Sequence, residues 1–388
     1  MNASLESSNA PLAPARGGSR TRLSGLLRKE FYQILRDPSS LAIAFVLPLV
    51  LLLIFGYGVS LDAEHVPVAL VVELPSPETA SFTSGFQQSR YFEPVFQRNL
   101  GEAEQALLDR RVMAIVHLRS DFARRLRQSG GAPIQVIVNG VDANTARLVL
   151  GYVQGVWQKW LQREALARGE TLAMPVQLEQ RIWFNSELRS RNFLVPGLIA
   201  VIMTLIGALL TALVMAREWE RGTMEALLVT PVTMREVLLG KLVPYFILGM
   251  GGMSLSVGMG VWLFGVPLRG SLWVLFAAAA LFLLAALGMG LLISTVTKNQ
   301  FVAGQLAIIT TFLPAFILSG FIFDIGSMPR IVQWLTHVLA ASYFVAILQT
   351  VFLAGNVWSV ILPNSLALLL MAAFFLGVSR RKLRKRLE

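Results

Sequence analysis

The stretch REWERGTMEALLVTPVTMREVLLGK, from Arg217 to Lys241, separates two of the most apolar blocks of the chain, Phe193–Ala216 and Leu242–Phe264. It carries eight charged residues, four of each sign, although only 15% of the whole chain is charged. About 20 consecutive apolar residues cross the hydrocarbon core of a bilayer. We therefore predict that this charged stretch lies outside the bilayer and connects two membrane-spanning helices.

The overall composition is that of a membrane protein. Of the 388 residues, 55% are hydrophobic and only 15% are charged, and the mean hydropathy is +0.61. In a typical soluble domain, roughly a quarter of the residues are charged. Cysteine is absent, which excludes disulfides and Cys-ligated metals. His65, His117 and His337 do not have the spacing of metal ligands, so we expect hydrogen-bonded structural histidines. We predict no cofactor in this chain.

Charge decides between six and seven membrane spans. Both ends of the chain are rich in Lys and Arg, and the positive-inside rule places both in the cytoplasm. The number of crossings is then even. A seventh apolar candidate, Ile331–Leu353, should enter from the outer side and return. The six predicted spans are Leu41–Val59, Phe193–Ala216, Leu242–Phe264, Leu272–Ile293, Phe301–Phe323 and Trp358–Val378.

The net charge of +11 follows from this topology, because nine of the eleven charges fall on the predicted cytoplasmic face. Anionic membrane lipid is a sufficient partner for such a face, so nucleic-acid binding is not predicted. Residues 1–21 should be a disordered cytoplasmic N-terminus, and residues 379–388 a basic cytoplasmic tail.

Residues 22–38 precede the first span, residues 39–59. Apolar side chains recur at 23, 26, 27, 31, 34 and 35, with Arg28, Lys29 and Glu30 assigned to the opposite face. Asp37-Pro38 should end this helix. Because the segment adjoins a span, we expect an amphipathic helix in the inner membrane interface.

Residues 60–191 differ from the rest, with 15 Lys or Arg and 14 Asp or Glu. Val66–Val72, Val112–His117 and Ile134–Val138 are predicted strands, and Leu100–Arg110, Asp121–Gln128 and Ala143–Arg168 predicted helices. This alternation predicts an inserted extracytoplasmic α/β domain, with a small sheet covered by helices. It shows no nucleophile paired with a base, so we favour a binding or gating module over an enzyme.

The spans lack acidic residues, although ion-coupled carriers keep ionisable groups at mid-membrane. A P-loop is missing too. Gly240-Lys241 is the nearest match, but Arg235 stands where the motif needs glycine, and Leu242 replaces its Ser or Thr. Any ATPase must therefore be a separate subunit, and this chain is not itself an enzyme.

The charged stretch could dock a short helix into that partner, with its carboxylates and Arg221 setting register and with Met224, Leu227 and Leu228 giving affinity. Alternatively, it is a solvated loop whose charges keep it out of the bilayer. Composition alone leaves both interpretations open.

At these residues the chain resembles the ABC-2 family of ABC-transporter permeases, the bacterial multidrug-type exporters with a large domain between spans one and two. The resemblance is carried by REWERGTMEALLVTPVT (217–233), LLRKEFYQILRDP (26–38), SRYFEPVF (89–96) and VDANTA (141–146). It implies a polytopic helical protein of the type V exporter fold in the bacterial inner membrane. Its transmembrane domain would be 192–378, with a coupling loop at 217–241 and an outer re-entrant segment at 325–356.

The resemblance also implies partners: a dimer of cytosolic ATP-binding cassette subunits that bind ATP and Mg, and a second copy of the permease or a sister chain. Family members of this type often work beside a periplasmic membrane-fusion protein and an outer-membrane channel, which this sequence does not itself indicate. The implied ATPase-coupling residues are Glu218, Glu220, Arg221, Gly222, Thr223, Glu225, Leu228 and Pro231.

In such exporters the substrate route follows spans two and five. The corresponding residues are Phe193, Leu194, Met203, Leu209, Phe312, Leu313, Phe316 and Phe321, all apolar. They suit hydrophobic or amphiphilic, drug-like or lipid-like substrates, although ordinary helix packing would explain any one of them. Two other functions stay open at this point: an ion-coupled secondary transporter or channel, and a non-transporting receptor or scaffold that uses residues 60–191.

Overall fold

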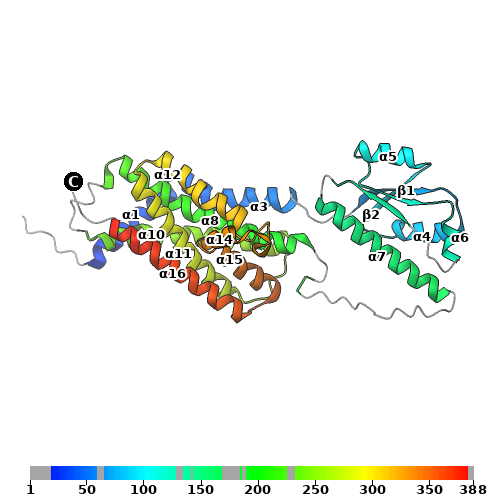
Figure 1. Cartoon of the computed structure of the whole chain (residues 1–388). Helices are drawn as coiled ribbons and strands as arrows, with labels where there is room; N and C mark the ends of the chain where they lie inside the picture. The colour runs from blue at the N-terminus through cyan, green and yellow to red at the C-terminus, as the bar shows by residue number, and fades with distance from the viewer. Residues whose placement is uncertain are drawn as a thin grey trace, which may run out of the picture. The chain divides into compact units, whose positions relative to one another are not determined.

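The computed structural model describes residues 19–58, 65–127, 134–140, 143–167, 184–185, 189–224 and 232–382. The chain forms two compact units, one of residues 1–59 with 182–388 and one of residues 60–181 (Figure 1). Several predictions lie outside the described residues: the order of residues 1–18, the Gly130-Gly131 helix stop, and the end of the basic tail beyond residue 382.

Among the described residues, the first unit has six helices long and apolar enough to cross a membrane, one for each predicted span. The first joins α2 (Pro38–Leu41), η1 (Ala42–Val46) and α3 (Leu47–Gly58), and the fifth joins α12 (Gln300–Ala307), η3 (Ile308–Phe312) and α13 (Leu313–Leu318). The third joins α10 (Met234–Gly258) and η2 (Met259–Leu263). The others are α8 (Ser190–Glu220), α11 (Leu272–Thr297) and α16 (Trp358–Lys382). The protein is therefore predominantly helical and multi-pass.

Helix α8 is the centre of this unit. In its most apolar window 94% of the residues are buried within the chain, against 22% for α16. It packs against α3, α10, α11, α12 and the shorter helix α15 (Ala340–Gln349). A helix that is apolar on every side can be surrounded by other helices, whereas the outer helices need only one buried stripe. A displacement of α8 would therefore change the packing of most helices in the transmembrane unit.

The seventh apolar candidate is bent. Helices α14 (Arg330–Thr336) and α15, continued by η5 (Thr350–Ala354), meet at 84°, as in a broken span or a re-entrant loop. The polar side chains in this segment bond to backbone carbonyls at the bend: Ser342 Oγ donates to Thr336 O at 2.9 Å, and Tyr343 OH to His337 O at 2.9 Å. These bonds stabilise a turn that would be costly in lipid.

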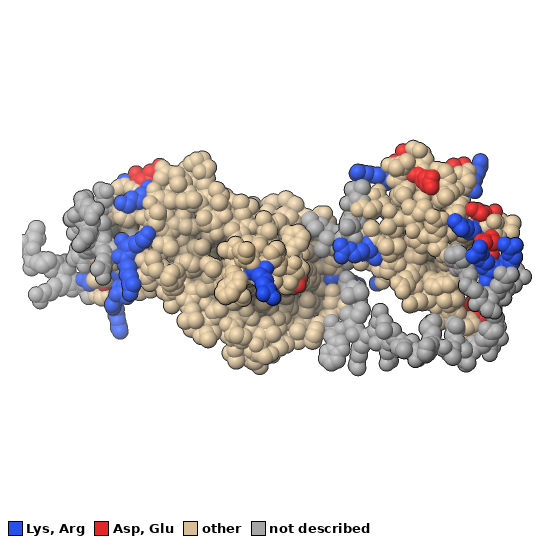
Figure 2. All heavy atoms as spheres, viewed as in Figure 1, with Lys and Arg blue, Asp and Glu red and all other residues tan. Residues whose placement is uncertain are grey.

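Aromatic and basic residues mark opposite ends of the transmembrane unit. Trp262, Trp273, Trp334 and Trp358 are all more than half exposed, and they lie where α10 ends, where α11 and α16 begin, and on α14. Arg380, Arg381 and Lys382 close the other end of α16. On the face seen in Figure 2, Lys and Arg gather near that end, and most of the remaining visible surface of the transmembrane unit is uncharged. Tryptophan belts and basic ends are both typical of membrane–water interfaces.

The described residues of the second unit form a four-stranded sheet with the order β2-β1-β3-β4, covered by helices. Its strands are β1 (Val66–Val72), β2 (Phe92–Gln97), β3 (Ala114–Leu118) and β4 (Gln135–Val138). Strand β1 is parallel to β2 and β3, and β4 is antiparallel to β3. Three strands and α5 (Leu100–Leu108), α6 (Phe122–Arg127) and α7 (Ala143–Ala167) match the predicted segments. Strand β2 and α4 (Pro77–Gln87) were not predicted.

Alternation along β1 places helices on both faces of the sheet. Val66, Val68 and Leu70 point to one core with α4, α6 and α7, and Ala69 and Val71 point to a second core with α5. The sequence predicted a sheet covered by helices, and the structure shows that the helices pack on both of its faces.

His117 of β3 is a satisfied structural histidine, as expected. Its Nε2 lies 2.7 Å from Glu73 Oε1, and its Nδ1 lies 3.1 Å from Gln135 Oε1. Hydrogen bonds from the Ser120 backbone and from His117 lower the pKa of Glu73 below its usual value. The pair fastens the end of β1 to β3 and leaves His117 no free ring nitrogen.

Candidate functional site

The charged stretch Arg217–Lys241 is divided between the end of α8 and the beginning of α10. Helix α8 continues to Glu220, Arg221 caps it, and Gly222 follows with a φ of 69°, a left-handed conformation that favours glycine. The description resumes at residue 232, and Thr233 caps α10. Glu225, Leu228 and Pro231 lie outside the described residues. The described parts of the stretch, residues 217–224 and 232–241, are therefore mostly helical, and their charges face different surroundings.

Lys241 is the centre of a buried ion cluster. Its Nζ lies 3.0 Å from Glu30 Oε1 and 2.5 Å from Glu218 Oε1, and all three residues are at most 5% exposed. Lys29, which is half exposed, contacts both carboxylates at 3.3 and 3.7 Å. The three buried residues come from α1 (Ser19–Leu35), α8 and α10. The cluster thus joins the N-terminal helix to two spans.

The cluster corrects one assignment. Glu30 was placed on the polar face of the N-terminal helix, but it is 1% exposed and lies one turn before the buried Ile34. Helical spacing alone would have found this, because position 30 is i+4 from 26 and i+3 from 27, both apolar positions. A buried carboxylate needs a cation, and Lys241 supplies it.

A second contact joins α1 to α10. Glu236 Oε2 accepts a hydrogen bond from Thr233 N at 2.7 Å, which closes a capping box. Its other oxygen accepts from Ser19 Oγ at 2.5 Å and from Arg22 Nη2 at 3.2 Å. The N-terminal helix is therefore held to α10 at two places, by Glu30 and by Ser19 with Arg22.

A third contact joins the first span to α8 and α12. Arg217 Nη1 lies 3.0 Å from Asp37 Oδ2, and its Nε donates to Gln300 Oε1 at 3.3 Å. Glu220 Oε2 accepts from the backbone N–H of Gln300 at 3.1 Å. Burial raises the pKa of Asp37, but hydrogen bonds from Ser39 and Ser40 and the Arg217 guanidinium outweigh it and hold the pKa below its usual 3.8.

Replacing Asp37 by Ala should destabilise the protein by about 1–2 kcal/mol, because it removes the helix cap of α2 and leaves Arg217 without its carboxylate. Because the folded pKa is lowered, this contribution is present above the unfolded pKa and is lost as the pH falls through the folded value. Chemical unfolding of the two proteins in detergent at pH 7 and pH 3 measures it. An equal difference at both pH values would contradict the ion pair.

Three predicted coupling residues remain at the surface. Glu220, Arg221 and Thr223 are exposed, whereas Glu218 is buried in the cluster. Met224, assigned to an apolar patch for a partner, is only 1% exposed and packs with Val237 and Leu238. Leu227 also lies outside the described residues. The end of α8 thus presents polar groups outward and anchors itself through Glu218 and Met224.

The predicted substrate-path residues come together within one chain. Leu194, Met203 and Phe321 share the main core, against which Phe312 and Phe316 pack, and Leu209 lies in a neighbouring cluster with Phe312. Phe193 and Leu313 are 37% and 44% exposed, whereas Met203 is fully buried. The set therefore divides into partly exposed residues and residues buried in the hydrophobic core of the transmembrane unit.

Sequence comparison assigns the class of protein that this geometry suits. A family model described as "ABC-2 family transporter protein" matches residues 38–380, and the chain belongs to this family. The resemblance predicted from residues 217–233 is confirmed.

Three known relatives align with at least three quarters of this chain and of their own length. The chain is 46% identical to the "Probable multidrug ABC transporter permease YbhS" of Escherichia coli K12, over 95% of this chain and 98% of that protein. It is 29% identical to the "Probable multidrug ABC transporter permease YbhR" of the same strain, over 88% and 94%. It is 27% identical to its "Inner membrane transport permease YhhJ", over 76% and 79%.

Proposed function

We propose that this protein is the permease subunit of an ATP-binding cassette exporter with the type V fold. A separate pair of cytosolic ATPase subunits binds ATP and Mg and drives transport through the end of α8. The Lys241 cluster carries this proposal. It joins α1, α8 and α10 through contacts of 2.5 and 3.0 Å at the end of the transmembrane unit where the charged stretch lies.

In the proposed mechanism, α1, α8 and α10 move as one rigid group. Because Glu30, Glu218 and Lys241 are buried and paired, pulling one helix away from the others would leave an uncompensated charge. A force applied to the exposed residues Glu220, Arg221 and Thr223 would therefore move the three helices together. Helix α8 is surrounded by its neighbours, so its shift changes their packing along the whole transmembrane unit.

The membrane orientation belongs to the same proposal. The basic end with both chain termini faces the cytoplasm, and residues 60–191 lie in the periplasm. The tryptophan belt at the opposite end supports this, since the α10–α11 connection with Trp262 and Trp273 would then reach the outer interface.

The proposal extends to substrates and further partners. The multidrug names of two relatives and the apolar set from Phe193 to Phe321 support hydrophobic or amphiphilic substrates. The set includes outward-facing residues such as Leu313, which would meet a second permease copy or a sister chain. A periplasmic membrane-fusion protein and an outer-membrane channel would complete an export route.

Replacing Arg221 by Ala tests the coupling. Purified together with the ATPase subunit in lipid nanodiscs, this variant should lose on the order of tenfold in permease-stimulated ATP hydrolysis, the effect of losing one charge-assisted contact. Its thermal midpoint should not change, because the Arg221 side chain is exposed and makes no hydrogen bond or ion pair with another described residue.

Arg330→Ala is the matched control. Arg330 is also exposed, but it begins α14, away from the charged stretch. ATP hydrolysis by this variant should equal that of the unchanged protein. Full stimulation by the Arg221→Ala protein would contradict the proposed route, as would transport that continues without any ATPase.

A further inference from the structure

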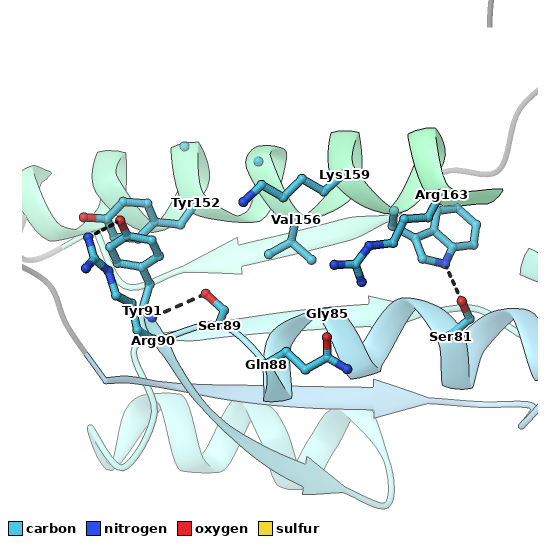
Figure 3. Close-up of a pocket in the computed structure, with 13 residues that line it drawn as sticks. Ser81, Gly85, Gln88, Ser89, Arg90, Tyr91, Tyr152, Val156, Lys159 and Arg163 are labelled. Carbon is cyan, nitrogen blue, oxygen red and sulfur yellow. Dashed lines mark hydrogen bonds between the residues drawn. The ribbon is translucent and has the colours of Figure 1, made fainter. Parts of the chain in front are cut away.

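A groove in the second unit has the composition of a ligand site. It lies between α7 on one side and α4 with the turn into β2 on the other, with a volume of about 520 Å³ (Figure 3). Small-molecule sites in proteins measure roughly 300–1,000 Å³. All its lining residues fall within 81–91 and 151–163, so the groove belongs to this unit alone.

The groove is strongly basic. Arg90, Lys159 and Arg163 line it, and none of its described lining residues is acidic. Figure 3 shows Lys159 and Arg163 extending from α7 over the space that Gln88 borders from the other side. Both are exposed, and neither makes a hydrogen bond or ion pair with any residue that the structure describes. Two cations one helical turn apart therefore face the same space, and no described residue serves as their counter-ion.

The walls supply flat apolar surface. Tyr91 and Tyr152 stack with ring centroids 4.2 Å apart, and Arg90 lies over the Tyr91 ring at 4.9 Å while its Nη2 donates to the Tyr91 hydroxyl at 2.9 Å. Trp160 is buried at the other end, where its Nε1 donates to Ser81 Oγ at 3.0 Å. These bonds fix the aromatic rings before any ligand arrives, which lowers the entropy cost of binding.

Two glycines keep the groove open. A Cβ atom added at Gly151 or Gly155 would meet no atom within 4 Å, so each position faces empty space. Each glycine inside a helix costs about 1 kcal/mol relative to alanine. The helix thus contains two destabilising residues at the place where a larger side chain would fill the groove.

We propose that this groove binds an organic anion with a flat apolar body. Lys159 and Arg163 would bind the anionic group, and Tyr91, Tyr152 and Val156 would contact the apolar part. The site goes beyond the permease function, because none of its residues belongs to the coupling contacts or to the apolar set of the spans.

Binding is tested on the full chain in nanodiscs of zwitterionic phosphatidylcholine, with naphthalene-2-sulfonate as the probe and isothermal titration calorimetry as the readout. The probe should bind, and the neutral analogue naphthalene-2-methanol should bind at least tenfold more weakly. Lys159→Gln combined with Arg163→Gln should weaken probe binding on the order of a hundredfold, about tenfold per charge removed.

Gly155→Leu separates a blocked site from a misfolded one. The leucine fills the groove, so probe binding should be lost, whereas the thermal midpoint should stay the same or rise because leucine favours helix. Arg147→Gln on the same helix, outside the groove, is the charge control and should bind normally. The proposal is overturned by no probe binding, by equal binding of the neutral analogue, or by normal binding in either groove variant.

Discussion

Replacing Lys241 by Met should destabilise the protein by about 3–5 kcal/mol, the cost of leaving buried charge without its partner. The lysine lies between two carboxylates, and Oε2 of both Glu30 and Glu218 is already buried without a hydrogen-bond partner. Lys29 is half exposed and 3.3 and 3.7 Å away, so it compensates only partly. Unfolding in mixed micelles with increasing SDS measures the difference.

The triple variant Lys241→Met, Glu30→Gln, Glu218→Gln shows whether charge is the cause. It removes all three buried charges while nearly keeping their volumes, and it should regain most of the lost stability. If transport also depends on these helices moving together, the triple variant should regain ATPase stimulation with its stability. A triple variant as unstable as Lys241→Met would mean that the lysine acts through packing rather than through its charge.

Replacing Gly290 by Ala should destabilise the helix pair α8–α11 by about 1–3 kcal/mol through overpacking. A Cβ atom at Gly290 would overlap the carbonyl oxygen of Ala208 and the hydroxyl of Thr211, and a backbone carbonyl cannot rotate away. Thr211 Oγ1 also donates to Leu287 O at 2.9 Å across this pair, so separating the helices weakens an interhelical hydrogen bond. Small residues that allow close approach are typical of membrane helix interfaces.

Gly377→Ala is the same chemical change on α16, where an added Cβ atom meets nothing within 4 Å. It should leave the free energy of unfolding unchanged or slightly raised. Both variants are compared with the unchanged protein in the same SDS titration. Equal stability of the two variants would show that α8 and α11 are not in close contact at Gly290.

Much of the candidate site was visible in the sequence as a set of residues, but not as an arrangement. The charged stretch 217–241 already held Glu218, Glu236 and Lys241. Their roles differ because Glu218 and Lys241 turn inward whereas Glu220 and Arg221 face outward. Composition does not distinguish the buried charges from the exposed ones, because the side that each charge faces depends on its position around the helix.

The sequence did not predict strand β2 and helix α4, because neither segment has the residue pattern typical of its element. Strand β2 contains Pro94 and has only Phe92 fully buried, so it lacks the Val-rich pattern of β1. Helix α4 is rich in Ser and Thr, which favour other structures in isolation. The available signal was Ser76 as a helix cap followed by Pro77 at the first helical position. Both elements form because the sheet and α7 bury Phe82, Phe86 and Phe92.

Residue types along short stretches were enough to predict six apolar spans, the N-terminal helix, three Val-rich strands and the family of the chain. The pairing of Glu30 with Lys241, 211 positions away, and the central place of α8 became visible only in the folded chain. The physical reason is that hydropathy is a local property, whereas the partner of a buried charge is chosen by the packing of distant helices.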